Sequence, residues 1–76
     1  MKTFSVIRQN DESGVSGTGK VLEGVVFKDG TTVIRWCVDG QPNSTAIYES
    51  FEAFKAIHID SHPTNETIIN MKEVVE

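Results

Sequence analysis

A glycine-rich loop with a basic end is the part of this sequence whose residue types best suit chemistry. It is the run Gly14-Val15-Ser16-Gly17-Thr18-Gly19-Lys20, which holds three glycines, two hydroxyls and one lysine. Glycine lets the backbone adopt positive φ and lets a ligand approach the main chain closely. Consecutive peptide N–H groups in such a loop can form a concave nest for an anion. The loop is therefore either a site for a phosphate or carboxylate, or a flexible connection whose glycines serve geometry alone.

If this loop binds an anion, its C-terminal half supplies the contacts. The backbone amides of residues 17–20 would line the nest. The hydroxyls of Ser16 and Thr18 and the ammonium of Lys20 would add side-chain contacts. The run matches only part of the phosphate-loop pattern of nucleotide hydrolases, because Val21 stands where a serine or threonine would hold magnesium. That motif must also open a helix, whereas the residues that follow here are strand formers. The sequence therefore argues against a hydrolase loop.

Further possible ligand contacts lie in the middle of the chain. Arg35 and Trp36 are adjacent in a predicted strand, so their side chains point to opposite faces. If Trp36 lies in the core, Arg35 faces outward, where its guanidinium fork suits a phosphate or carboxylate. An exposed aromatic ring, Trp36 or Tyr48, would offer a stacking face. The alternative is a solvated Arg35 that pairs with Glu23 across a hairpin.

The remaining reactive residues form no catalytic or metal-binding pattern. His58 and His62 are four residues apart, a spacing that can share a metal on a helix, but Pro63 indicates that the helix has ended. His58 is better explained by an interaction with the helix C-terminus or by a polar ligand contact. The single cysteine, Cys37, stands among apolar strand residues and is expected to be buried and inert. We therefore expect no enzyme activity, no metal and no cofactor.

Composition and length limit the classes of function. The 76 residues carry a net charge of −4 and no basic stretch, which argues against nucleic-acid binding. A chain of this size forms one domain, residues 1–76, whose small core favours a ligand site in a surface groove or between copies. One cysteine, with no signal peptide and no membrane-spanning segment, predicts a cytoplasmic protein without a membrane partner. Exposed sheet edges make a homo-oligomer possible.

Runs of β-branched and aromatic residues predict a mainly β fold with one short helix. The expected strands are residues 3–8, 20–27, 31–38, 44–48 and 67–72. Ser50 is the expected N-cap of a helix at residues 51–58, with Phe51 and Phe54 on its apolar face. Gly24, inside the second strand, predicts a bulge or a tight bend. The order suits a small twisted antiparallel sheet or an SH3-like barrel of about five strands. The alternative is a small α+β sheet with the helix on one face.

The sharpest local prediction is a hairpin around Asp29-Gly30. This dipeptide lies between two strand-forming runs and suits a two-residue type I′ turn, which needs positive φ at both central residues. Counting outward from such a turn places Glu23 opposite Trp36. Glu23 would then be a diagonal neighbour of Arg35, close enough for the pairing considered above.

One long stretch of the chain also carries a specific motif pattern. Residues 11–31 read D-x-S-G-V-S-G-T-G-x-V-x-E-G-V-x-F-x-D-G-T, followed by Arg35-Trp36, Ser44-Thr45 and, later, Ala56-Ile57-His58. The pattern resembles a family of short bacterial and phage proteins that has no established activity. Where such relatives carry a glycine-rich turn after the helix, this chain has Ile-Asp-Ser-His-Pro at residues 59–63. The resemblance implies a phage or bacterial setting rather than a mechanism.

We expect this chain to be a small binding protein without enzyme activity. In the preferred interpretation it sequesters an anionic, nucleotide-like ligand through the glycine loop, in a role such as phage counter-defence. The expected ligand contacts are Ser16, Gly17, Thr18, Gly19, Lys20, Arg35, Trp36 and Tyr48. The alternative is a protein–protein interaction module that inhibits a host factor through the loop or an exposed sheet edge. A small ligand would stabilise the folded chain, whereas a module would capture one host protein.

Overall fold

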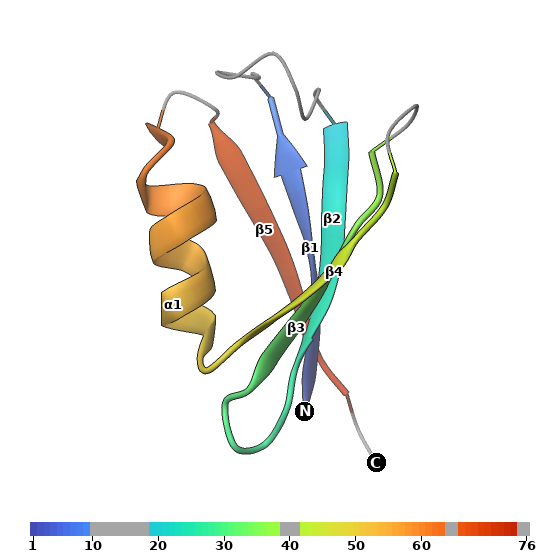
Figure 1. Cartoon of the computed structure of the whole chain (residues 1–76), viewed down its shortest axis with the longest axis vertical. Coiled ribbons are helices and arrows are strands. Elements are labelled where there is room, and N and C mark those ends of the chain that lie inside the picture. Colours follow the sequence, from blue (N-terminus) through green and yellow to red (C-terminus); the bar gives the residue numbers. More distant parts are fainter. Residues whose placement is uncertain (10–18, 39–41, 64–65, 75–76) are drawn as a thin grey trace.

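The computed structural model describes residues 1–9, 19–38, 42–63 and 66–74 (Figure 1). The strands within these ranges are β1 (Lys2–Arg8), β2 (Gly19–Val26), β3 (Thr32–Trp36), β4 (Thr45–Tyr48) and β5 (Thr67–Glu73). Between β4 and β5 the chain forms α1 (Phe51–Lys55), which continues directly into a π-helical turn, η1 (Ala56–Asp60). Each element lies within a few residues of its predicted position.

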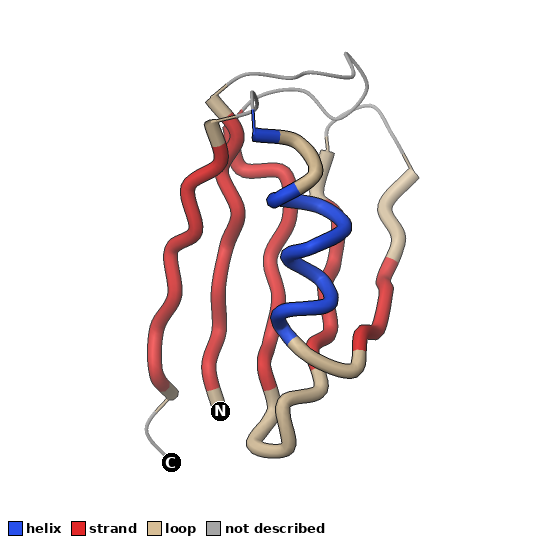
Figure 2. The backbone as a smooth tube through the Cα atoms, turned by 90° about the vertical axis from the view of Figure 1, so that its left-hand side faces the viewer, coloured by secondary structure: helices blue, strands red, loops and turns tan. Residues whose placement is uncertain are grey.

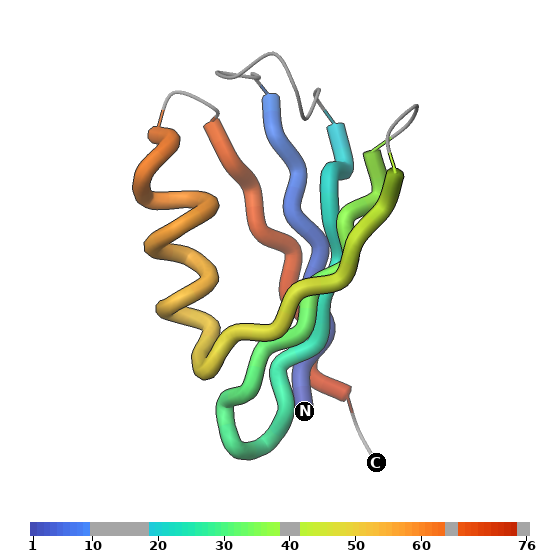
Figure 3. Tube along the Cα trace, viewed as in Figure 1, coloured from blue at the N-terminus to red at the C-terminus, as the bar shows by residue number. Residues whose placement is uncertain are grey.

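All five strands belong to one antiparallel sheet in the order β4-β3-β2-β1-β5. Strands β1 to β4 pair in sequence order, and the last strand returns to lie beside the first (Figure 3). The helical segment lies over one face of the sheet (Figure 2). The sheet stays open, with β4 and β5 at its edges, because α1 covers its apolar face. The mainly β prediction is confirmed, in the form of an open sheet with one short helix.

The β2–β3 hairpin forms at the predicted place but with a different turn. The amide of Phe27 donates to the Thr31 carbonyl oxygen at 2.8 Å, so the loop between them has three residues instead of two. Gly30 closes this loop with a φ of 94°, a conformation that suits glycine. The amide of Thr31 also donates to Asp29 Oδ1 at 2.9 Å, which holds the turn.

The longer turn shifts the pairing of β2 with β3 by one residue. Glu23 lies directly opposite Arg35, and Leu22 lies opposite Trp36. The predicted register, with Glu23 opposite Trp36, is therefore wrong, because it assumed a two-residue turn. The opposite orientations of the Arg35 and Trp36 side chains do match the prediction, since Trp36 packs against the core while Arg35 is exposed.

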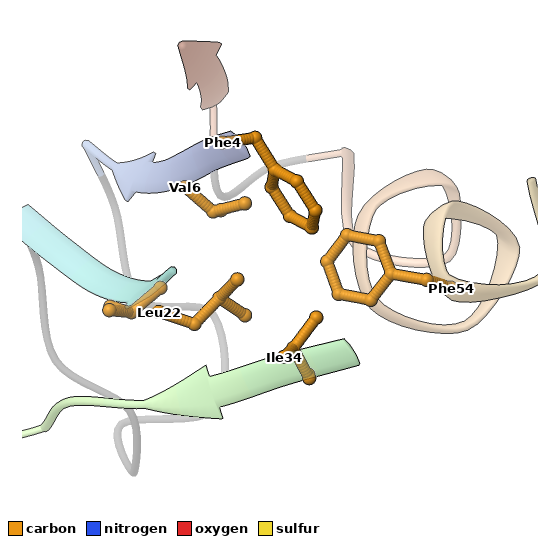
Figure 4. Close-up of a cluster of buried hydrophobic side chains, with 6 residues drawn as sticks. Phe4, Val6, Leu22, Ile34 and Phe54 are labelled. Atoms are coloured by element: carbon orange, nitrogen blue, oxygen red, sulfur yellow. The ribbon is translucent and has the colours of Figure 1, made fainter. Parts of the chain in front are cut away.

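The hydrophobic core lies between the sheet and α1 (Figure 4). Its buried apolar side chains are Phe4, Val6, Val21, Leu22, Ile34 and Phe54. Alternate residues of a strand share one face, which is why β1 contributes both Phe4 and Val6. Phe54 reaches down from α1 into the centre of this layer and is 0% exposed. The core therefore joins the helix to the three central strands.

Gly24 is required by this core. A Cβ atom on Gly24 would lie 2.5 Å from Cζ of Phe4 and 2.8 Å from the carbonyl oxygen of Val33. Both distances are far inside normal contact. The Phe4 ring cannot easily move aside, because it packs against the rings of Phe51 and Phe54 at centroid distances of 5.2 and 5.5 Å. The predicted bulge or bend at Gly24 is therefore replaced by a close approach of a side chain to the backbone.

The bulge in β2 lies at Val21 instead. Ile7 of β1 pairs with Lys20, and the register shifts there by one residue. Val21 is the extra residue, and its side chain is buried in the core. The bulge interrupts the alternation of faces, so Lys20 and Glu23 point to the same side of the sheet although three residues separate them. This brings their opposite charges together.

The helical segment begins as predicted and ends differently. The hydroxyl of Ser50 accepts a hydrogen bond from the amide of Ala53 at 3.1 Å, which caps the first turn. Glu52 stands in that turn, where the helix dipole favours a negative charge. The predicted helix at residues 51–58 changes after Lys55 into a π-helical turn that extends to Asp60. Such turns often occur at functional sites.

Candidate functional site

The sheet face opposite α1, the open face, carries a groove of about 490 Å³. This open-face groove is lined by Thr3, Phe4, Ser5, Lys20, Glu23, Gly24, Val25, Val33, Ile34, Arg35, Asn70 and Lys72. The lining residues come from β1, β2, β3 and β5. Volumes of about 300–1,000 Å³ are typical of small-molecule sites, so the groove has the size of a ligand site.

The strand register aligns polar side chains in one row across the open-face groove. Asn70, Ser5, Glu23, Arg35 and Thr45 are successive partners from β5 to β4. Opposed residues of antiparallel strands share a face, with Cβ atoms about 4.5–5.5 Å apart. The row therefore gathers an amide, two hydroxyls, a carboxylate and a guanidinium in one area.

Three cations and one carboxylate line the groove: Lys20, Arg35, Lys72 and Glu23. Lys20 Nζ lies 2.8 Å from Glu23 Oε2. Their hydrogen bond, together with the attraction of the opposite charges, raises the pKa of Lys20 and lowers the pKa of Glu23. Both groups remain charged at neutral pH. The groove thus carries net positive charge in a chain whose formal net charge is −4.

Arg35 keeps its charge available in this groove. Its guanidinium Nη1 donates to Oγ1 of Thr45 at 3.0 Å, which is a neutral partner. The pairing of Arg35 with Glu23 considered from the sequence does not form, because Glu23 binds Lys20 instead. Among the described residues, no carboxylate lies within ion-pair distance of Arg35. Further N–H donors of the guanidinium are free to meet an anion.

Of the predicted loop site, only the last two residues, Gly19 and Lys20, are among the described residues. Ser16, Gly17 and Thr18 lie outside the described residues, so their role stays a prediction. Gly19 begins β2 with a φ of 83°, and Lys20 follows it into the open-face groove. The structure therefore brings two of the predicted contacts, Lys20 and Arg35, to one surface.

Trp36 and Tyr48 lie on the other side of the sheet, beneath the helical segment. The ring centroid of Trp36 is 5.3 Å from that of His58, and Cζ of Arg8 lies 5.7 Å from the Trp36 ring centre. The hydroxyl of Tyr48 is 2.6 Å from Nε2 of His58. These contacts fasten η1 to the sheet. The two aromatic rings are thus separated from the groove cations by the thickness of the sheet.

His58 is held in a partly buried position by these contacts. Burial is the main factor that lowers its pKa, and the neighbouring charges of Arg8 and His62 lower it further. The Arg8 side chain also donates to the backbone carbonyl oxygen of His58 at 3.4 Å. The sequence-based interpretation of His58 as a helix-terminal residue is correct in position, but the contact with Tyr48 was not anticipated.

The lowered pKa of His58 predicts a loss of stability in mild acid. The unfolded chain binds a proton at the ordinary histidine pKa of about 6.5, whereas the folded chain resists it. The free energy of unfolding should therefore fall as pH drops below about 6.5, until the folded form is protonated too. Thermal unfolding at pH 7.5 and 5.5 measures this. His58→Gln should flatten the dependence and His62→Gln should keep most of it; an unchanged pH profile in the His58 variant would contradict the prediction.

Sequence reasoning missed Ser5, Asn70 and Lys72 as groove residues. They lie on the first and last strands, which are neighbours in the sheet. The two strands are far apart in the sequence, however, since 65 residues separate the paired Ser5 and Asn70. The available signal was the alternation of polar and apolar residues in these strands, which places all three away from the core. The alternation shows on which face of the sheet a side chain lies, but it does not show which strand lies next to it.

The described part of the chain holds neither a metal-binding cluster nor a membrane-spanning helix. Within it, no three His, Cys, Asp or Glu side chains come together in a way that could hold a metal ion. The helices found there are also too short or too polar to cross a bilayer. Cys37 is a partly buried free thiol, and its amide donates to the Val21 carbonyl oxygen at 2.9 Å.

Comparison with curated proteins and with solved structures finds no match. A family model described as Acb5 phage protein does match, over residues 1–72. The matched range includes every residue that lines the open-face groove. It also agrees with the phage setting that the motif pattern at residues 11–31 implies. The chain thus belongs to the Acb5 phage protein family.

Proposed function

We propose that the chain binds an anionic, nucleotide-like ligand in the open-face groove and holds it without changing it. The observation that carries this proposal is the convergence of Lys20, Arg35 and Lys72 on one groove of about 490 Å³ in an otherwise acidic chain. Binding of this kind would withhold a signalling nucleotide from the host. Such a counter-defence role is consistent with membership of a phage protein family.

Each part of a nucleotide has a matching group in the groove. The guanidinium fork of Arg35 suits two oxygens of one phosphate, and Lys72 adds a second positive charge. Val25 and Val33 lie opposite each other and offer an apolar floor for a sugar or base. Glu23 can accept hydrogen bonds from base N–H groups. A nucleotide would thus be recognised by more than its charge.

The state of the groove carboxylate supports a proposal of binding without turnover. The contact with Lys20 lowers the pKa of Glu23, which makes this carboxylate a weak base and keeps it ionised at neutral pH. A general acid or base works best when its pKa is near the working pH. Glu23 is therefore suited to recognition rather than to proton transfer.

The proposal predicts that a nucleotide binds the wild-type chain and that groove variants bind it more weakly. The probes are nucleoside monophosphates, linear and cyclic dinucleotides, and inorganic phosphate, tested by thermal shift and by calorimetric titration at low salt. Arg35→Ala and Lys20→Ala should each reduce affinity about ten- to a hundredfold, since a hydrogen bond to a charged group contributes about 1.5–3 kcal/mol. Both variants should stay folded, because these side chains are exposed.

Lys28→Ala is the matched control for these variants. Lys28 is an exposed lysine of the β2–β3 turn that does not line the groove, so its loss should leave affinity unchanged. Two results would contradict the proposal: no probe binds the wild-type chain, or a bound probe is held equally well by the Arg35 and Lys20 variants.

A row of apolar side chains on the open face favours a second candidate function. Ile47 is 72% exposed and lies opposite Val33, which in turn lies opposite Val25. Exposed apolar patches often mark protein–protein contacts. A module that inhibits a host protein would use this row. Ile47→Lys should then abolish capture of that protein while leaving nucleotide binding intact.

A further inference from the structure

Strand β5 forms a long, regular edge of the sheet. It pairs with β1 over all seven residues from Thr67 to Glu73, without a register shift, and no other strand of the described residues lies on its other side (Figure 1). The opposite edge, β4, has only four residues. Natural sheets protect such edges with charged side chains, proline, bulges, covering segments or short strands, because the unpaired backbone groups invite another strand. β5 carries Lys72 and Glu73 near its C-terminal end, but it has neither a proline nor a bulge.

Exposed apolar side chains stand on both faces of this edge. Ile68 is 42% exposed and Met71 is 39% exposed. The side chains of even-numbered and odd-numbered residues of a strand point to opposite faces. Ile68 therefore lies on the open face and Met71 on the helix face. Exposure of apolar side chains to water on both faces is unfavourable for an edge strand that has no binding partner. A second strand laid along β5 would cover both side chains.

We infer that β5 pairs antiparallel with β5 of a second copy of this chain, about a twofold axis at Asn70. With the axis at Asn70, each of the seven residues of β5 pairs with a residue of the partner's β5, whereas any other position of the axis leaves residues unpaired. It places Ile69 opposite the partner's Met71, and Met71 opposite the partner's Ile69, so apolar side chains meet twice on the helix face. It also places Lys72 opposite the partner's Ile68.

The positive charges of the edge are compatible with this register. The two Lys72 side chains stay apart, because the twofold axis sends them to opposite ends of the paired strands. Self-complementary pairing of one patch with itself is the usual geometry of a twofold dimer. The free strand edge, the apolar contacts and the separation of the two lysines thus fit the same partner.

The dimer would be one continuous sheet with both helical segments on one side. The two open-face grooves would lie on the other side, adjoining at the axis, because Asn70 and Lys72 line the groove. This inference does not rest on the proposed ligand, since the edge can be tested in the absence of any nucleotide.

The first test is the mass of the wild-type chain in solution, by sedimentation equilibrium and native mass spectrometry at micromolar concentration. We expect twice the 8.4 kDa of the single chain. Ile68→Lys places an ammonium opposite the partner's Lys72 at both ends of the interface, and like charges directly opposed destabilise a strand pair. The dimer dissociation constant should rise at least about tenfold.

Ile47→Lys is the matched control. It makes the same change on the other edge strand, at a side chain even more exposed than Ile68, and should leave the dimer intact. Far-ultraviolet circular dichroism shows whether each variant is folded. A wild-type monomer would overturn the inference, and so would a dimer that Ile47→Lys dissociates while Ile68→Lys does not.

A cysteine at the axis tests the register separately. In a Cys37→Ser background, Asn70→Cys should form an intermolecular disulfide on mild oxidation, because a residue on the twofold axis meets its own copy. Opposed Cα atoms of about 4.5–5.5 Å lie within the range that a disulfide spans. Lys72→Cys in the same background should cross-link poorly. The reverse pattern would contradict an axis at Asn70.

Discussion

Phe54→Ala should lower the free energy of unfolding by about 3–5 kcal/mol, enough to unfold much of the population. Phe54 is 0% exposed, and its ring centroid lies 5.5–5.7 Å from those of Phe4, Tyr48, Phe51 and His58. Its removal leaves a cavity where the helix meets the sheet. A domain of this size buries little surface, so its stability margin is small. Urea unfolding followed by circular dichroism measures the loss.

Phe27→Ala is the matched control for this substitution. It removes the same side chain from a position that is 45% exposed and outside the core cluster. The expected loss is well below that of Phe54→Ala. If both variants lose the same stability, the core is not where the structure places it.

Gly24→Ala should lower the free energy of unfolding by about 1–3 kcal/mol, although alanine suits a strand better than glycine does. The added Cβ would meet Phe4 Cζ at 2.5 Å and the Val33 carbonyl oxygen at 2.8 Å. The ring of Phe4 is held by two other rings of the core, and the Val33 oxygen belongs to the backbone, so neither contact relaxes cheaply. Thermal and urea unfolding measure the change.

A second substitution separates this crowding from other effects of the glycine. Phe4→Leu shortens the side chain that meets the new methyl group. The double variant Gly24→Ala/Phe4→Leu should therefore be more stable than the sum of the two single losses implies. Additive losses, or a Gly24→Ala variant as stable as the wild type, would contradict the clash.

The alternation of residue types predicted much of the fold. It placed all five strands and gave the opposite orientations of Arg35 and Trp36, because each strand has one face toward the core. The N-cap at Ser50 was predicted for a similar local reason, since the hydroxyl and the amide it binds are three residues apart. Local chemistry of this kind can be read without knowing the neighbours in space.

The misplaced details depend on such neighbours or on small differences between turns. A two-residue and a three-residue turn both fit Asp29-Gly30, and choosing the shorter one shifted Glu23 from its true partner, Arg35. The bulge was expected at Gly24, but glycine there makes room for the distant ring of Phe4. The bulge at Val21 has no glycine to mark it.

The candidate site was predicted in part for the same reason. Lys20 was predicted as a contact because it is a charged residue at the end of the glycine loop, and Arg35 because it is a charged residue of the hairpin. Both line the same groove. Lys72 reaches that groove only because β5 returns to pair with β1, a long-range pairing that no local pattern specifies. Trp36 and Tyr48 were grouped with the cations by residue type alone, and the sheet separates them.

The central claim is that the open-face groove holds an anionic ligand, and the most direct test is native mass spectrometry of the chain purified gently from the cells that made it. We expect an additional mass of nucleotide size that is lost on denaturation and is absent from the Arg35→Ala variant prepared in the same way. A wild-type chain that carries no ligand, or an adduct that Arg35→Ala retains in full, would contradict it.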